Sequence, residues 1–508
     1  MLSTRIEELM IESGETVQSL AEMMDVDRTT LQKIKTGKRL PTREILNRLI
    51  AVLRLSKAEE NELVKLFDIE KNGARKYKTR MMVKELLEMI SELTEYKMPV
   101  QKQVDTKSLD CSDGDNQGNE KIVKGRENVI ALMHQVIDRE IYFQEEPQIS
   151  MLTSNRQDYL YHYIFQEMMG NKKKLRLQDV IAFDKESYED DMALSSLKFL
   201  MGISLLENVS YDSNYLTVEN GQNSSGTKNN AYFILTAKEV LVISKDLKIG
   251  VRYRNQERID YYSMQFRMLS NQSEQFIIEN DNPLFLYTEF DTEYKPLMVL
   301  EPIPCFANYF TAQFVENKIR KDFPFYPALL PFAIKFYGNL RENAKNMKNV
   351  FSYKYLEQFM EIGELYLPEV VTDRVTPPER LALLKLVRQD LASGKHPIYM
   401  IRDDAIFMND SFECSDAKAS IQIIFHYRIR GHQIFKSISL RKTTIQEAFK
   451  DFFDHLPDSD LVLSEQETLK KLDILIDRYE KIAEYNSFID PFLLGGAFNQ
   501  PVSELKTS

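Results

Sequence analysis

Several residue types that carry recognisable chemistry are scarce in this chain of 508 residues. It has no tryptophan and only three cysteines, Cys111, Cys305 and Cys414, too far apart to form a CxxC pair. Neither a zinc knuckle nor a disulfide framework is therefore indicated, and unpaired thiols fit a reducing compartment. No segment approaches the roughly 18 consecutive apolar residues of a membrane span, and the first ten residues have no apolar signal-peptide core. We expect a soluble, cytoplasmic protein without a membrane partner.

The short motifs of common enzyme classes are also missing. The chain has no HExxH, no GxxxxGK[ST] and no GxGxxG, which argues against HExxH zinc peptidases, P-loop nucleotide hydrolases and dinucleotide-binding enzymes. Its six histidines are scattered along the sequence. We therefore predict that the protein is not an enzyme, with no catalytic residue, no metal site and no cofactor.

Positive charge is concentrated at one end of the chain. The net charge is -11, yet residues 1–85 carry 17 Lys and Arg against 14 Asp and Glu, and the remainder carries 49 against 63. A mildly basic head on an acidic body suits a protein that touches nucleic acid with one end only.

The most informative segment is residues 16–42, which predicts two short helices joined by a tight turn. Thr16 and Asp27 stand where each helix needs an N-cap, Asp25 lies in the turn where a positive φ is required, and Gly37 ends the second helix. The apolar positions that would pack the two helices together are Leu20, Ala21, Met24, Val26, Leu31 and Ile34. From Arg28 to Arg43 there are six basic side chains and no acidic one.

A helix that enters the major groove needs hydrogen-bonding side chains outside and apolar ones inside. The outward residues here are Arg28, Thr29, Gln32 and Lys33, with Thr30 and Lys35 nearby, and Leu31 and Ile34 point inward. With Leu20-Ala21, Val26 and the exit loop Gly37-Lys38-Arg39-Leu40-Pro41-Thr42, the segment from about Leu9 to Phe67 resembles the Cro/C1-type helix-turn-helix family, also called the XRE family.

The resemblance implies roles for individual residues. Arg28, Thr29 and Lys33 would read base edges, and Thr16, Thr30, Lys38 and Arg39 would contact phosphates. Many family members have glutamine at the second position of the first motif helix, where this chain has Val17; Gln18 is the candidate replacement. A solvated exit loop is the alternative interpretation of Lys38 and Arg39.

The rest of the chain predicts a multidomain protein, with an all-α head of five short helices and a large α+β body. We expect the head at residues 1–70, with a first helix at 4–12 opened by a Thr4–Glu7 capping box. A connecting helix should follow at 71–96, with Leu86 and Ile90 on an apolar packing stripe, and then a flexible linker at 97–120. The body would comprise α+β domains at 121–320 and 321–500. The similar patterns of 232–244 and 398–410, the latter read as two strands, favour a divergent repeat.

The sequence thus predicts a sequence-specific transcriptional regulator whose head reads a pseudo-palindromic operator on double-stranded DNA. One head contacts few phosphates, so we expect a homodimer, with a body that dimerises and senses a small-molecule or peptide effector. Two alternatives remain: a DNA-targeted enzyme or defence effector with an unrecognised catalytic body, and a peptide sensor with a helical-repeat body. The β-branched runs near 231–253 and 421–440 argue against the helical repeat.

Overall fold

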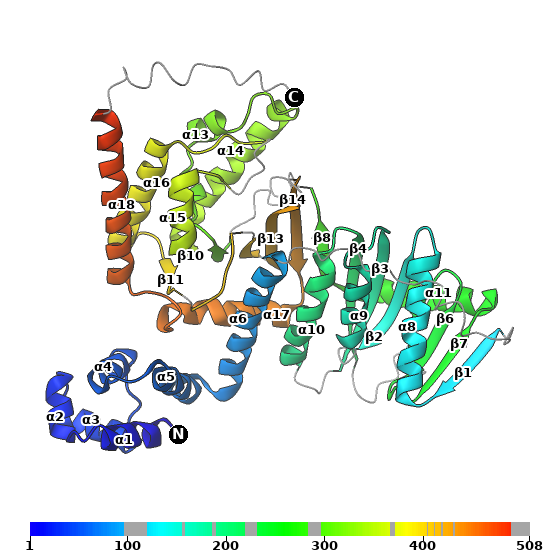
Figure 1. The fold of residues 1–508 in the computed structure, drawn as a ribbon, viewed down its shortest axis with the longest axis horizontal. Coiled ribbons are helices and arrows are strands. Elements are labelled where there is room, and N and C mark those ends of the chain that lie inside the picture. Colours follow the sequence, from blue (N-terminus) through cyan, green and yellow to red (C-terminus); the bar gives the residue numbers. More distant parts are fainter. Residues whose placement is uncertain are drawn as a thin grey trace, which may run out of the picture.

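A computed structural model describes residues 1–95, 119–154, 158–184, 189–218, 231–282, 296–365, 371–403, 405–410, 412–417, 420–429 and 432–488. It confirms an all-α head and a large body of helices around one 14-stranded sheet (Figure 1). This sheet excludes the helical-repeat alternative. Among the described residues, no helix is both long and apolar enough to cross a bilayer.

The head contains the five short helices that the sequence predicts. They are α1 (Leu2–Glu12), α2 (Val17–Met23), α3 (Arg28–Lys35), α4 (Arg43–Leu53) and α5 (Lys57–Asn72). Their inward side chains form a cluster of their own, with Leu20, Leu31 and Leu46 fully buried. The first helix starts two residues earlier than predicted: it begins after Met1, whose side chain makes no cap, so the Thr4 capping box is wrong.

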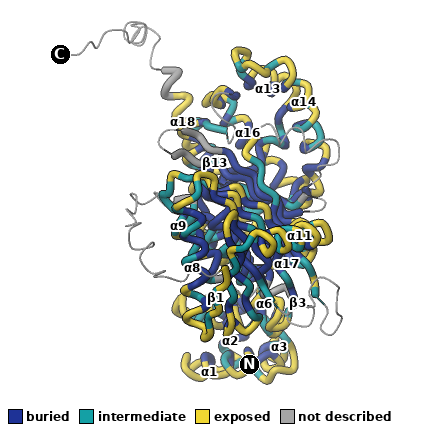
Figure 2. Tube along the Cα trace, turned by 90° about the vertical axis from the view of Figure 1, so that its right-hand side faces the viewer, coloured by how far each residue is buried: buried dark blue, intermediate teal, exposed yellow. Residues whose placement is uncertain are grey.

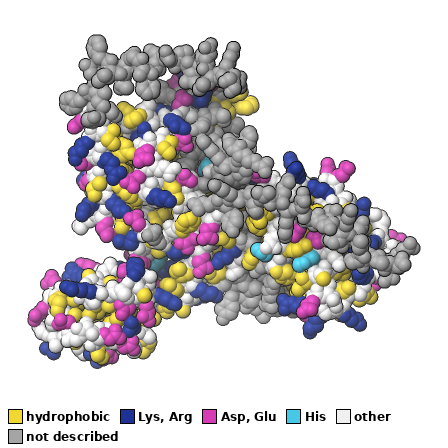
Figure 3. Space-filling view, viewed as in Figure 1, with side chains coloured by type: hydrophobic (Ala, Val, Ile, Leu, Met, Phe, Trp, Pro, Cys, Tyr) yellow, Lys and Arg dark blue, Asp and Glu magenta, His cyan; other side chains and the backbone are white. Residues whose placement is uncertain are grey.

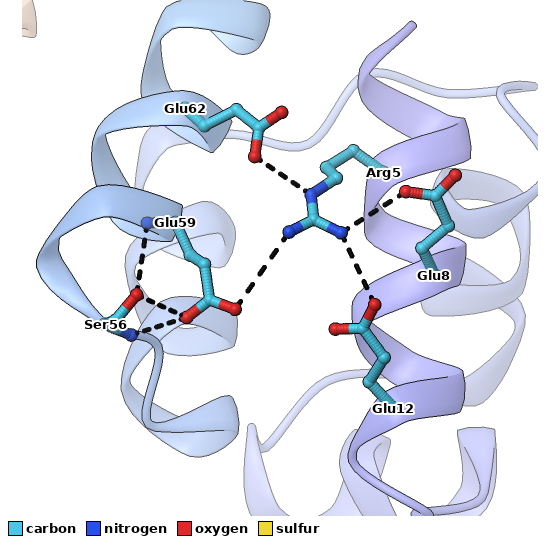
Figure 4. Close-up of polar contacts among 6 residues, drawn as sticks. All are labelled: Arg5, Glu8, Glu12, Ser56, Glu59 and Glu62. Atoms are coloured by element: carbon cyan, nitrogen blue, oxygen red, sulfur yellow. Dashed lines mark hydrogen bonds and ion pairs between the residues drawn. The ribbon is translucent and has the colours of Figure 1, made fainter.

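Helices α1 and α5 are joined on the surface of the head by one arginine (Figure 4). Arg5 donates from Nε to Glu62 at 3.0 Å and lies 3.3 Å from Glu8 and 3.6 Å from Glu12. Its other nitrogen lies 4.0 Å from Glu59, which closes the capping box of Ser56. These exposed pairs each stabilise weakly, but together they orient the first helix on the last.

The body sheet has the strand order β1-β7-β6-β5-β2-β3-β4-β8-β14-β13-β12-β9-β10-β11. The strands are β1 (Glu120–Lys124), β2 (Gln148–Ser154), β3 (Leu175–Asp184), β4 (Val209–Val218), β5 (Ala231–Leu235), β6 (Val240–Ser244), β7 (Ile249–Tyr253), β8 (Glu274–Asn280), β9 (Met298–Glu301), β10 (Lys348–Ser352), β11 (Ile398–Ile401), β12 (Phe412–Ala417), β13 (Ser420–Ile429) and β14 (His432–Leu440). Helices cover the sheet, and its central strands are buried (Figure 2).

The sheet is built from two stretches with the same topology. In the first, β2, β3 and β4 are parallel, and the antiparallel strands β5, β6 and β7 continue from β2. In the second, β9, β10 and β11 are parallel, and β12, β13 and β14 continue from β9 in the same way. Strand β8 joins them by antiparallel pairing with both β4 and β14. The two stretches therefore share one strand order and one pairing pattern, and their origin as a divergent repeat stays a prediction.

The two stretches face opposite ways. Because β8 is antiparallel to both neighbours, β9, β10 and β11 run opposite to β2, β3 and β4, so the second stretch is turned over along the sheet. The helix that ends each stretch, α11 (Gln256–Gln272) or α17 (Thr443–His455), consequently lies on a different face. Leu152 and Val180 of β2 and β3 pack with α11, whereas their neighbours Met151 and Ile181 belong to the core that contains α17.

Our alignment of the repeat was wrong in register. Residues 232–244 form β5 and β6, whose equivalents are β12 and β13, whereas 398–401 form β11, the equivalent of β4. The sequence predicts two strands in 396–410, but the described residues of this range form one strand, β11. Apolar alternation marks a buried strand but does not say which strand of a repeat it is.

Further helices pack around the sheet. Those of the first stretch are α8 (Arg126–Phe143), α9 (Asp158–Met168) and α10 (Glu189–Ser204); those of the second are α13 (Ala312–Lys318), α14 (Tyr326–Asn343), α15 (Tyr353–Ile362), α16 (Pro377–Ala392) and α18 (Glu465–Phe488). Short 3-10 turns occur at Phe306–Tyr309, Ala344–Asn346 and Leu456–Asp458. Strands from both sides of residue 320 thus share one sheet, and the domain boundary there stays a prediction.

Helix α6 (Ala74–Glu95) attaches the head to the body. Its stripe of Val83, Leu86, Leu87 and Ile90, completely buried, is part of the body's main core, between α10 and α17. Residues 97–118 of the predicted linker lie outside the described residues, and Glu120, its last residue, begins β1. The described contacts between head and body are made by α6 and the head helices, which precede that segment. The apolar stripe on α6 is stable only when it is covered, and the body covers it.

Polar contacts support the same junction. Arg80 of α6 donates to Asp451 of α17 at 2.6 and 3.1 Å. Arg43, the first residue of α4, lies 3.2 Å from Asp460, and Lys71 lies 3.6 Å from Asp458. The 3-10 turn after α17 and the residues that follow it therefore contact the head at the start of α4 and near the end of α5.

Candidate nucleic-acid interface

Helices α2 and α3 are held together by small and branched side chains. Ala21 of α2 is 2% exposed, which lets the helices approach closely, and Leu31 and Ile34 of α3 are buried as predicted. Leu20 completes this contact from α2. The inward face of α3 is therefore packed against the head, and this packing fixes the orientation of the helix.

The turn between the helices has the predicted strained residue and a donor that the sequence did not reveal. Asp25 has φ 51°, a region that aspartate tolerates better than most residues. Arg48 of α4 donates from one nitrogen to the carbonyls of Met24 at 2.9 Å and Asp25 at 3.3 Å. These carbonyls lie at the end of α2, where partners are missing. In the sequence, the one signal that could have indicated Arg48 is that the carbonyls at the end of α2 require a hydrogen-bond donor.

Both predicted N-caps are present. Thr16 accepts from the Ser19 amide at 3.1 Å, and Asp27 accepts from the amides of Thr29 at 2.7 Å and Thr30 at 3.3 Å. The Thr29 hydroxyl also donates to Asp27. These hydrogen bonds lower the pKa of Asp27, and the one from the Thr29 hydroxyl has the largest effect. The Thr29 hydroxyl has used its only proton, so toward a base it can act only as an acceptor.

The outward face of α3 is exposed and cationic. Arg28, Gln32 and Lys33 are exposed, and so are Lys38 and Arg39 in the loop that follows. Within the described part of the chain, none of the four cations forms an ion pair. The visible face of the head carries cationic and anionic side chains intermixed (Figure 3). The absence of acidic residues from 28 to 43 therefore holds for α3 and its exit loop and not for the head as a whole.

Two predicted contact residues are partly engaged within the head. Lys35 lies 3.3 Å from Glu7 of α1, because its position turns it toward the neighbouring helix. Gln18 donates to Glu22 on its own helix at 2.5 Å. The contacts proposed for all ten residues with DNA stay predictions.

The exit loop is held by the end of α3. The amides of Lys38 and Arg39 donate to the carbonyl of Lys33 at 2.9 and 3.2 Å, and Gly37 has φ 70°. A side chain at Gly37 would meet the Ser3 hydroxyl at 3.1 Å. The backbone that carries the two basic side chains is therefore held by hydrogen bonds, while the side chains themselves are exposed, and a solvated loop stays the alternative to phosphate contact.

No second chemical centre emerges from the described residues. They contain no group of three or more His, Cys, Asp or Glu side chains that could hold a metal ion. Cys305 and Cys414 are free and buried, and burial raises the pKa of each thiol. Neither is a candidate nucleophile, because the reactive form is the thiolate.

Comparisons with known proteins bear on the head alone. Curated proteins give no match. An archaeal chromatin protein, TrmBL2, described as showing a novel mode of DNA binding, is 10% identical over 52% of this chain and 99% of its own, with a TM-score of 0.21. The polyphosphate kinase of Porphyromonas gingivalis is 10% identical over 76% of this chain and 60% of its own, with a TM-score of 0.22. Both scores are too low to bear on this chain.

A family model described as helix-turn-helix matches residues 6–59. The match covers α2, the turn at Asp25, α3 and α4, together with most of α1 and the start of α5. Residues 6–59 are therefore a helix-turn-helix domain of the Cro/C1 type.

Proposed function

We propose that the protein is a sequence-specific transcriptional regulator that binds double-stranded DNA through α3. The observation that supports this most is the exposed face of that helix. Arg28 and Lys33 are exposed and form no ion pair with any described residue, and the inner face of the helix is packed against the head. A surface arginine or lysine without an acidic partner is available to a base edge or a phosphate. The proposal assigns the cytoplasmic body dimerisation and effector sensing rather than catalysis.

The positions of the basic residues suggest that those on α3 contact bases and those on the exit loop contact phosphates. Arg28, at the start of α3, can bond O6 and N7 of a guanine together, a contact that contributes about 1–3 kcal/mol of discrimination. Lys33 lies about 1.4 turns further along α3, on the side of the helix that carries Thr29, four residues before it. Lys38 and Arg39, on the ordered exit loop, would bind phosphates and set the register.

A single head of this size makes few phosphate contacts, so we propose that two copies bind together. A two-fold dimer would read two half-sites about 34 Å apart on a pseudo-palindrome. Occupancy of an effector on the body would change the spacing or orientation of the two heads.

The test begins with selection of bound sequences from a random DNA library by the full chain. Titrations then compare the wild type with Arg28→Ala, Lys38→Ala and, as a control, Lys65→Ala, an exposed lysine on α5. Arg28→Ala should relax specificity at one position. Lys38→Ala should weaken binding to every sequence and lower the salt slope by about 1. Equal behaviour of all three variants would refute the assignment of α3.

A further inference from the structure

Helix α11 carries large apolar side chains on the side that faces away from the sheet. Tyr261, Met264 and Met268 follow one another at helical spacing and are 42%, 47% and 49% exposed. The opposite side is also apolar, with Phe266 and Leu269 buried against β2, β3 and β5. Exposed charged side chains such as Glu257, Asp260 and Arg267 flank this apolar stripe, and an exposed apolar patch with a polar rim marks an interaction site. The exposed outer side of α11 is visible in Figure 2.

The repeat shows how the equivalent helix is covered. Helix α17 ends the second stretch as α11 ends the first, and its outer side packs against α6 and α10. The contact includes the Arg80–Asp451 pair. No described element plays the part of α6 on α11. The same structural position is thus internal in one half and exposed in the other.

Two further exposed apolar side chains lie on the edge strands of the sheet, on the face that α11 covers. Gly250 of β7 faces Val123 of β1 and Val129 of α8, so the alternate residues Ile122 and Ile249 point to the other face, where α11 lies. They are 58% and 45% exposed. Together with Tyr261, Met264 and Met268 they define what we call the α11 surface.

The charges around this surface are complementary to those of a second copy. Asp260 lies toward the start of α11 and Arg267 toward its end, both exposed on the outer half of the helix. Each makes a hydrogen bond within α11, Asp260 from Gln256 at 2.8 Å and Arg267 to the Ser263 carbonyl at 3.4 Å, and neither forms an ion pair with another described residue. Antiparallel packing of two α11 helices around Met264 places each Asp260 beside the partner's end that carries arginine, as an isologous two-fold interface requires.

We propose that the α11 surface is the homodimer interface, with the α11 helices of two copies packed antiparallel across a two-fold axis. The inference rests on the proposed function insofar as that function requires two copies, and it adds the surface that joins them. The occupant is a second copy of the whole chain. The start of α11 carries Glu257 and Asp260 against Arg258, a net negative charge, and its end carries Arg267. The apolar residues and their charged flanks therefore match themselves when one copy is rotated by half a turn.

Sedimentation velocity of the full chain tests the surface over a range of concentrations. The wild type should sediment as a dimer, and Met264→Arg with Met268→Asp should raise the dimer dissociation constant at least 100-fold. Phe332→Asp on α14, where Phe332 is 50% exposed, is the matched control and should remain dimeric. Far-ultraviolet circular dichroism shows whether each variant is folded.

Charge reversal keeps the proposal testable if the double variant fails to fold. Asp260→Arg and Arg267→Asp should each weaken the dimer about 10-fold, and the two together should restore it. A monomeric wild type, or a dimer unaffected by these changes, overturns the α11 surface. Binding of a single half-site duplex by the wild type and by each variant is measured in parallel. Loss of the dimer with half-site binding retained leaves the proposed function standing, whereas a dimer that binds no DNA sequence selectively overturns the function alone.

Discussion

The burial of α6 leads to a quantitative prediction about how the body is stabilised. Leu86 and Ile90 are completely buried between α10 and α17, and replacing a buried leucine or isoleucine by alanine costs about 2–5 kcal/mol. Since a domain is stable by only about 5–15 kcal/mol, Leu86→Ala with Ile90→Ala should remove a large part of the free energy of unfolding of the body. Glu92→Ala, on the exposed side of the same helix, should have little effect.

The assay is urea unfolding of the full chain followed by native-state hydrogen exchange. In the double variant, amide protection should fall in α6, α10 and α17. It should be retained in α2 and α3, because the head has a separate apolar cluster. An unfolding midpoint equal to that of Glu92→Ala would refute the reasoning, since α6 would then not be part of the body core.

Three further changes are predicted from local geometry. Arg48→Ala removes the donor to the turn before α3 and should cost about 1–2 kcal/mol, with faster amide exchange at that turn and weaker DNA binding although Arg48 is not a predicted contact residue. Gly37→Ala should destabilise the head more than Gly14→Ala, because both have positive φ but only Gly37 has a close neighbour; thermal unfolding of the two variants decides. Burial raises the pKa of Asp179 to about 6, so the stability it contributes is complete below about pH 4 and is lost, by roughly 3 kcal/mol, as pH rises through 6. Asp179→Asn should remove that part of the slope of unfolding midpoint against pH.

The sequence predicted the head well because its signals are local. Thr16 and Asp27 are caps within three residues of the amides they bind, and the apolar spacing of Leu31 and Ile34 depends on helical periodicity alone. The body was predicted only as a class. Its strand order depends on pairings such as β4 with β8 and β8 with β14, which no local pattern encodes.

The candidate site shows the same limit. Its exposed face could be predicted, but Arg48 contacts carbonyls that are 23 and 24 positions earlier in the chain. The engagement of Lys35 by Glu7 likewise depends on how α1 crosses α3. Such contacts follow from tertiary packing, and a pattern of residue types does not contain them.

Helix α6 is bound by both halves of the sheet and carries the head at its other end. Asn409 of the second half donates to the Ser91 carbonyl at 2.7 Å, and Lys198 of the first half lies 2.7 Å from Glu85. Nearer the head, Arg80 of the same helix is bound to Asp451 of α17. Helix α6 is therefore clamped along most of its length, and a movement of one half of the sheet against the other would strain the helix on which the head is carried.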